Sequence, residues 1–201
     1  LSFTVREVAV EGGYPEFAEE TTRLTAPFRD RRMTAAELFD LAAAIEQAYA
    51  RGGYILVRVN PPPQSLVDGG TARLVVVDGF IEAVDAAAVP ARLRRPVERY
   101  LRPLVNRRRL TQGRLERQVL LAGQIPGSSV TTTLTKGVRP GGVKLVVNSG
   151  HDLVSGQASF DNRLGEAFGS RALSVQWSLA SAAGYGEQLY GFFGADPDLT
   201  R

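Results

Sequence analysis

The single histidine of the chain is the first residue to test for chemistry, because imidazole is the commonest general base in enzymes. His151 stands next to Asp152, at a predicted turn before a strand. A serine hydrolase of the α/β type would carry its nucleophile in a G-x-S-x-G turn, and the sequence contains no such segment. We therefore expect a structural or surface role for His151 and a protein that is not an enzyme.

Two other groups resemble ligand sites and fit neither a metal nor a phosphate. Asp161 and Asn162 are adjacent, but a lone carboxylate beside an amide lacks the second carboxylate that most such chemistry needs. The paired glycines, such as Gly52-Gly53 and Gly141-Gly142, never form a G-x-G-x-x-G or Walker pattern, so turns explain them. Cysteine is absent, which excludes disulfides and thiolate sites. No metal and no cofactor is expected.

Arginines gather in the middle of the chain. Between Arg92 and Arg117 there are ten of them against two acidic residues, Glu98 and Glu116. Three interpretations stay open: a solvated helix face, a contact for anionic lipid head groups or an acidic client segment, and a nucleic-acid surface. Nucleic acid is the least favoured, because no aromatic platform beyond Tyr100 is interleaved. The predicted basic surface consists of Arg94, Arg95, Arg99, Arg102, Arg107, Arg108 and Arg109.

A short threonine-rich segment could bind a peptide through its backbone. If it lies at a sheet edge, it offers unpaired N–H and C=O groups to an extended chain, a mode that demands little of the partner's sequence. The alternative is an edge that only faces solvent. The predicted client-binding residues are Ser129, Val130, Thr131, Thr132, Thr133, Leu134 and Thr135.

The elements that must position these residues occur twice in the same order. The first set is a strand, two helices and two strands. Its second helix begins at the capping-box residue Thr34, and the strand that follows this helix is predicted at 54–60. The second set begins at Phe80. A repeat longer than about 50 residues indicates tandem small domains. The sequence therefore predicts an α+β protein with βααββ units at residues 1–79 and 80–149.

The last part of the chain, residues 150–201, has a different character. Three segments of about ten residues alternate in the manner of tilted transmembrane β-strands. In the middle one, Leu173, Val175, Trp177 and Leu179 share one face, opposite serine and glutamine. A soluble hairpin with one buried face has the same pattern. No run of 18 apolar residues predicts a spanning helix, and no signal peptide is visible at the start, which is expected to be trimmed.

These segments together resemble a known family. A helix beginning at Met33-Thr34, Gly53-Tyr54, Pro62-Pro63-Gln64 and the run from Val77-Asp78-Gly79 to Ile81 are similar to the first POTRA domain of two-partner secretion transporters. The run RLTQGRLERQVLLAGQIPGSSVTTTLTKG resembles the second such domain. Phe160-Asp161-Asn162 resembles the family's first barrel strands, although Arg163 to Glu166 and Gly184-Tyr185-Gly186-Glu187 depart from its pattern.

The resemblance implies two periplasmic POTRA domains before an outer-membrane β-barrel, in bacteria. The chain is then expected to be a fragment that recognises an unfolded secreted partner, with an N-terminal secretion domain, and feeds it to the pore. The full-length barrel would meet outer-membrane lipid, and open edge strands would let the fragment self-associate. Asp161 and Asn162 would belong to a barrel-strand motif. The alternatives are an assembly factor of the same superfamily and a nucleic-acid-binding module using the arginines, although no nucleic-acid partner is expected.

Overall fold

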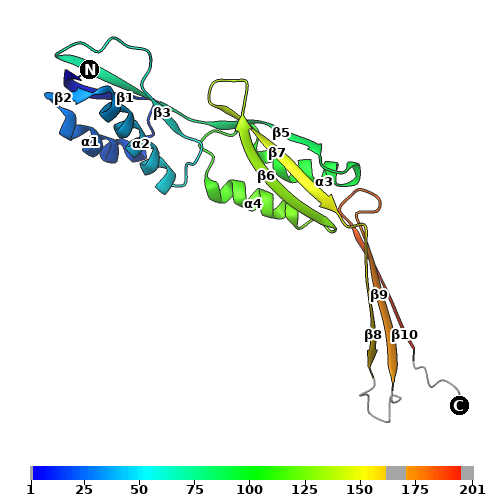
Figure 1. Cartoon of the computed structure of the whole chain (residues 1–201). Helices are drawn as coiled ribbons and strands as arrows, with labels where there is room; N and C mark the ends of the chain where they lie inside the picture. The colour runs from blue at the N-terminus through cyan, green and yellow to red at the C-terminus, as the bar shows by residue number, and fades with distance from the viewer. Residues whose placement is uncertain (1, 162–170, 196–201) are drawn as a thin grey trace, which may run out of the picture. The chain divides into compact units, whose positions relative to one another are not determined.

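The computed structural model describes residues 2–161 and 171–195 (Figure 1). The predicted order of strands and helices is present twice, with three more strands after it. The elements are β1 (Ser2–Glu11), η1 (Pro15–Phe17), α1 (Ala18–Thr25), η2 (Ala26–Phe28), β2 (Arg31–Thr34), α2 (Ala35–Arg51), β3 (Arg58–Asn60), β4 (Gly70–Val77), β5 (Phe80–Ala88), α3 (Ala91–Leu101), η3 (Arg102–Leu104), α4 (Gln112–Gly123), β6 (Ser128–Lys136), β7 (Gly142–His151), β8 (Val154–Asp161), β9 (Ala172–Ala180) and β10 (Gln188–Ala195).

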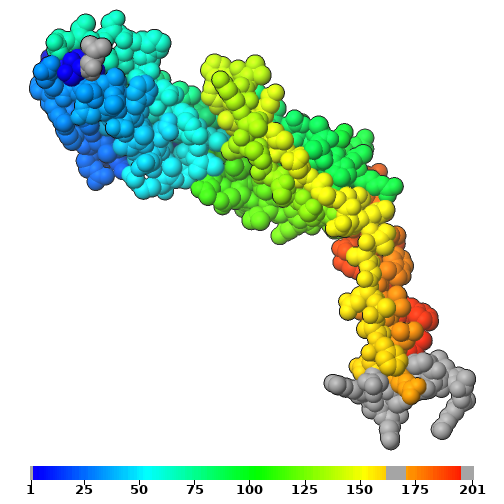
Figure 2. Space-filling model, in the orientation of Figure 1, coloured from blue at the N-terminus to red at the C-terminus, as the bar shows by residue number. Residues whose placement is uncertain are grey.

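The first sheet has the strand order β2-β1-β4-β3. β1 and β4 are parallel, and the two outer pairs are antiparallel. Its core is built from alternate strand residues such as Val5 and Leu74 and from the inner face of α2, where Ile45 and Tyr49 are fully buried. Figure 2 shows these elements, in blue and cyan, as one closely packed body.

Local signals define α2, as the sequence predicts. The Thr34 hydroxyl accepts the N–H of Glu37, and the Glu37 carboxylate accepts the N–H of Thr34, so that two donors of the first turn are satisfied. The helix ends at Arg51, before Gly52 and Gly53, and the latter has a φ of 86° that favours glycine. Its buried residues recur at helical spacing, which places one apolar face against the sheet.

The second sheet has the order β5-β7-β6, and the third has the order β10-β9-β8. The third sheet is antiparallel throughout. Its strands match the three C-terminal segments that the sequence predicts. None of the helices in the described residues is long and apolar enough to cross a membrane.

Two elements of the first sheet differ from the sequence prediction. The strand predicted at 54–60 covers only Arg58–Asn60, because Tyr54 turns inward and its carbonyl accepts the N–H of Val57. The Tyr54 ring contacts those of Tyr14 and Phe17, at centroid distances of 5.1 and 5.8 Å. β2 adds a strand that local alternation did not indicate.

The described contacts divide the chain into two compact units. One comprises Leu1–Ala83, Leu104–Arg117 and Leu134–Leu145, and the other comprises Val84–Pro103, Gln118–Thr133 and Val146–Arg201. The domain boundaries at residues 79 and 149 stay a prediction.

Candidate functional site

The threonine-rich segment lies in β6, which is an edge strand. Among the described strands, β7 is the only neighbour of β6 in the sheet, and Ser129 to Thr135 occupy all but the two terminal residues of β6. Exposed and half-buried side chains alternate from Ser129 to Thr133. The exposed side chains of this part of β6 all carry a hydroxyl group. An edge strand leaves every second N–H and C=O on its outer side without a ladder partner. The open edge required for strand addition is therefore present.

One hydroxyl of β6 is already used inside the sheet. The Ser129 Oγ accepts the backbone N–H of Gly150 at 3.0 Å, which ties the start of the strand to the end of β7. A Cβ at Gly150 would lie 2.6 Å from this oxygen, so the contact depends on glycine at that position. The start of the edge is therefore anchored, and the central hydroxyls of Thr131 and Thr133 remain exposed.

The predicted basic surface is divided among different contacts. Arg94 donates to the carbonyls of Ala87 and Val89, and the guanidinium of Arg99 lies 5.5 Å from the Tyr100 ring centroid. Two other members of the basic surface contact residues that lie earlier in the chain. Arg108 donates to the Asp78 carbonyl at 2.6 Å, and Arg109 pairs with Glu16. Several of these cations therefore stabilise the fold in addition to facing solvent.

Phe80 lies between Arg108, a member of the predicted basic surface, and Arg139, which is not one. We call this arrangement the Phe80 cluster (Phe80, Glu82, Arg108 and Arg139). The guanidinium carbons of Arg108 and Arg139 are 4.1 and 4.6 Å from the ring centroid, within the range of cation–π attraction. Phe80 is only 3% exposed. Sequence reasoning missed this cluster, since its members are separated by up to 59 positions and no local pattern joins them.

Glu82 completes the Phe80 cluster. Its carboxylate accepts the backbone N–H groups of Arg139 at 3.0 Å and Val138 at 2.8 Å, and it faces the Arg139 guanidinium at 3.7 Å. These two backbone donors, followed by the charge of Arg139, lower the pKa of Glu82 below its ordinary value of 4.5. The ionised form therefore fixes the loop before β7.

The Glu82→Gln variant should be less stable than the wild type near neutral pH, and this difference should disappear in acid. Because folding lowers the pKa of Glu82, its contribution is complete above the unfolded value and disappears as pH falls through the folded one. We expect the wild type to be the more stable protein at pH about 6 and the gap to narrow below pH about 4. Urea unfolding followed by circular dichroism at several pH values measures it. A gap that is constant across this range would contradict the assigned role.

A second arginine contact involves Tyr14, after β1. The guanidinium of Arg109 lies 4.5 Å from the Tyr14 ring centroid, and its backbone N–H faces both carboxylate oxygens of Asp78. The Tyr14 N–H donates to the Tyr49 hydroxyl at 2.9 Å. Burial, and then the neighbouring Asp78 carboxylate, raise the pKa of Tyr14. Tyr14 is therefore a neutral aromatic platform under a cation.

The third sheet has one face made only of apolar residues and glycine. In β9 this face carries Leu173, Val175, Trp177 and Leu179, and the register aligns it with matching residues of both neighbours. Large side chains on it are exposed in this chain, Trp177 at 42% and Phe193 at 62%. Trp177 covers Gly191, where a Cβ would collide with the indole. The β8 and β10 members are Val154, Gly156, Ala158, Phe160, Leu189, Gly191, Phe193 and Ala195.

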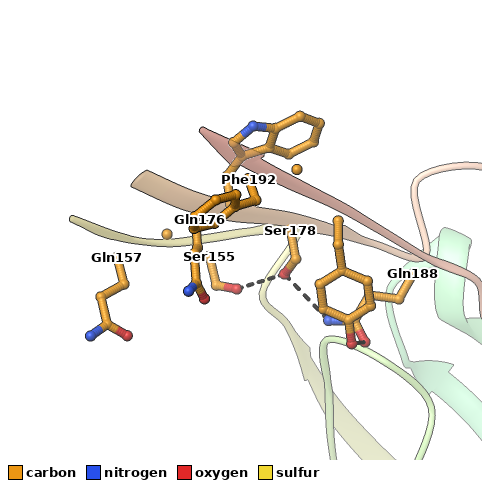
Figure 3. A pocket seen from close by; sticks show the side chains of 10 residues that line it. Ser155, Gln157, Gln176, Ser178, Gln188 and Phe192 are labelled. Carbon is orange, nitrogen blue, oxygen red and sulfur yellow. Dashed lines mark hydrogen bonds between the residues drawn. The ribbon is translucent and has the colours of Figure 1, made fainter. Parts of the chain in front are cut away.

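The opposite face is mostly polar and hydrogen-bonded, and the exposed ring of Phe192 also lies on it. Ser155 and Ser178 share a hydrogen bond of 2.8 Å, and the Gln188 amide donates to Ser178 at 3.3 Å. Figure 3 shows these side chains with Gln157 and Gln176, which extend from the same side of the sheet. They line part of a hollow of about 620 Å³. This alternation, apolar on one face and polar on the other, is the pattern that the strands of membrane barrels have.

The remaining sequence candidates lie at strand ends. Asp161 ends β8, and Asn162 lies outside the described residues. The imidazole Nε2 of His151 is 2.9 Å from the Ala180 carbonyl oxygen, a structural contact between β7 and β9. Within residues 2–161 and 171–195, no group of three histidine, cysteine or acidic side chains could hold a metal ion.

Comparison with known proteins places the N-terminal segment of the chain in a family. Residues 3–79 match the model of the ShlB-type POTRA domain. This segment is a POTRA domain. Its βααββ order is the one that the sequence predicts, and the short strand β2 is an addition that the sequence did not predict.

Curated relatives of the POTRA-bearing chain are transporters. The heme/hemopexin transporter protein HuxB of Haemophilus influenzae is 20% identical over 94% of this chain and 34% of its own length. The outer membrane transporter CdiB of Escherichia coli is 33% identical over 45% of this chain and 16% of its own. The chain thus spans about a third of the length of the first relative it matches.

Solved structures support the same fold. CdiB from Escherichia coli superposes with a TM-score of 0.74, at 22% identity, over all of this chain and 37% of its own length. CdiB from Acinetobacter baumannii gives 0.53 at 12% identity, over 98% of this chain and 39% of its own. The predicted α+β fold of tandem POTRA domains followed by strands is confirmed.

The resemblance to two-partner secretion transporters is likewise confirmed by the domain match and the relatives. Residues 3–79 thus carry a POTRA domain, and the predicted location at the bacterial outer membrane agrees with the description of CdiB as an outer membrane transporter. The predicted client-binding and basic residues stay predictions.

Proposed function

We propose that this chain recognises an unfolded secreted protein in the periplasm and passes it to the pore of an outer-membrane barrel. The observation that carries the proposal is the open edge of β6, with Ser129 to Thr135. The client would be an exoprotein with an N-terminal secretion domain. The chain would act by binding alone, without covalent chemistry.

The chemistry of the edge suits an unfolded client. Main-chain hydrogen bonds supply affinity to any extended segment, and small hydroxyl side chains place few demands on its side chains. The exposed residues of the central part of β6 are serine and threonine, and Leu134 is 38% exposed. A strand of the client would therefore extend the sheet beyond β6.

The third sheet supports the second half of the proposal. In a complete barrel its apolar face would meet lipid and its serine and glutamine face would line the lumen. Three strands cannot close, and backbone groups at an open edge have no partners in lipid. Outside a complete barrel, this chain would pair its edges with those of a second copy.

A strand-breaking experiment tests the proposal. N–H groups alternate between the two edges of a strand, so one of Thr131→Pro and Thr132→Pro removes a donor from the open edge and leaves the ladder with β7 intact. Circular dichroism and thermal unfolding identify the variant that retains the fold. The Thr131→Val variant is the matched control, because it changes a side chain and no backbone donor.

Binding is measured with the full chain in detergent and the unfolded N-terminal segment of the exoprotein encoded beside it. The folded proline variant should bind about ten-fold more weakly than the wild type, and Thr131→Val should bind like the wild type. Equal affinity of the folded proline variant and the wild type would overturn strand addition at β6.

A further inference from the structure

One edge of β1 is only half covered. β2 pairs with Ser2 to Val5, and beyond it the Asp30 N–H donates to the Arg6 carbonyl at 3.1 Å. From Glu7 to Glu11, β1 pairs with β4 on its other side, and no strand among the described residues pairs with it on the side of β2. A length of open strand edge therefore follows the end of β2.

The orientation of the backbone at this edge follows from the Arg6 contact. In a trans peptide the N–H of Glu7 points opposite to the carbonyl of Arg6, toward β4. The N–H and C=O groups of successive residues point to opposite edges of a strand. Those of Val8 and Val10 therefore point to the open edge. Two residues thus present the donors and acceptors that an added strand would use.

A groove of about 410 Å³ lies between this part of β1 and α1, on one face of the sheet. Its floor contains the half-buried side chains of Val8 and Val10, and its wall contains Ala18, Thr22 and Thr25. The Thr22 hydroxyl donates to the Ala18 carbonyl at 2.8 Å, and that of Thr25 donates to the Thr22 carbonyl at 3.2 Å. Both hydroxyls are thus bound to the helix backbone, and the groove suits apolar side chains.

The other face of the same edge carries two glutamates. Glu7 and Glu11 alternate with the two valines along β1, so their side chains lie on the face away from the groove. Both are exposed, and Glu11 pairs with Arg73 at 2.8 Å. A strand added beside β1 would place alternate side chains next to these carboxylates, where cations are favoured and anions are repelled.

We propose that the β1 edge and its groove bind a second extended peptide segment, in which small apolar residues alternate with lysine or arginine. The apolar residues enter the groove over Val8 and Val10, and the basic residues lie beside Glu7 and Glu11. The inference rests on the proposed function for the source of the segment, the same unfolded client. It differs in place and in chemistry, because the β6 edge lies in the second sheet and presents hydroxyl side chains.

The test uses the full chain in detergent and fluorescein-labelled octapeptides. In one probe valine alternates with lysine, and in the other valine alternates with glutamate. The wild type should bind the lysine probe at least about ten-fold more tightly than the glutamate probe. The Glu7→Lys variant should reduce this preference. A wild type that binds neither probe, or both equally, would overturn the inference.

A groove-filling variant separates this site from β6. Thr22 is exposed, so the Thr22→Arg variant should fold while filling the groove, and its affinity for the lysine probe should fall about ten-fold. The Ala26→Arg variant adds the same charge at an exposed position outside the groove and should bind normally. If only the β6 proline variant loses the probe, the inference fails and client binding at β6 stands. If Thr22→Arg loses the probe while the β6 variant binds both probe and client normally, the inference holds and the β6 proposal fails.

Discussion

The Phe80→Ala variant should lose about 3–5 kcal/mol of unfolding free energy, the range observed when a buried phenylalanine is truncated. Phe80 is 3% exposed, so the variant leaves a cavity at the start of β5. It also removes the ring between Arg108 and Arg139, whose cation–π contacts each contribute roughly 0.5–2 kcal/mol. Urea unfolding of the full chain, followed by circular dichroism, measures the change.

The Phe39→Ala variant is the matched control for Phe80→Ala. Phe39 lies on α2 and is 60% exposed, so the same atoms are removed where water already reaches them. A surface substitution of this kind should change the unfolding free energy by at most about 0.5 kcal/mol. Similar losses in the two variants would mean that the Phe80 cluster does not stabilise the junction between β4 and β5.

Locally encoded elements are those that the sequence predicts best. Thr34, Glu37 and the apolar residues of α2 lie within one segment, and each favours the same helix. The predicted strand at Ser129 to Thr135 lies within β6, because threonine and valine favour strands wherever they are placed. Its position at a sheet edge depends on strand order, which the sequence left open and the structure provides.

The elements that the sequence did not predict depend on distant partners. β2 has four residues and is recognised only by its pairing with β1, more than 20 residues away. Tyrosine favours strands, but the contacts of the Tyr54 ring with those of Tyr14 and Phe17 turn the chain before β3. The sequence predicts a basic surface at Arg108 and Arg109, because a high density of charge is visible in a sequence. The aromatic rings and carboxylates that contact these two arginines come from residues 14–16 and 78–80.

The same limit applies to the β1 groove. One strand, β1, supplies both the floor of the groove and the open edge. The alternation of valine with glutamate along this strand is visible in the sequence. The pairing of β2 with β1 ends at Val5 and leaves the rest of the β1 edge open, and this is determined by the register of the two strands. Candidate peptide sites in this chain are thus predictable as strands and become sites only through their neighbours.

The Val175→Arg variant should lose most of its affinity for lipid, by roughly 2–4 kcal/mol if the residue reaches the bilayer centre. Val175 lies in the middle of β9 on the apolar face, between Leu173 and Trp177, and register places Ala158 and Phe193 beside it. An arginine there would carry its charge into hydrocarbon. The adjacent Gln176 lies on the polar face, so Gln176→Arg adds the same charge and should leave lipid affinity nearly unchanged.

Trp177 provides the measurement, because it is the only tryptophan of the chain and lies on the apolar face. With phosphatidylcholine vesicles that contain brominated lipid, the wild type and Gln176→Arg should show quenched Trp177 fluorescence, and Val175→Arg should not. Flotation of the vesicles measures the bound fraction independently. Equal loss of quenching in both arginine variants would mean that charge alone, and not the face on which it lies, controls membrane association. The assignment of lipid to the Trp177 face would then be wrong.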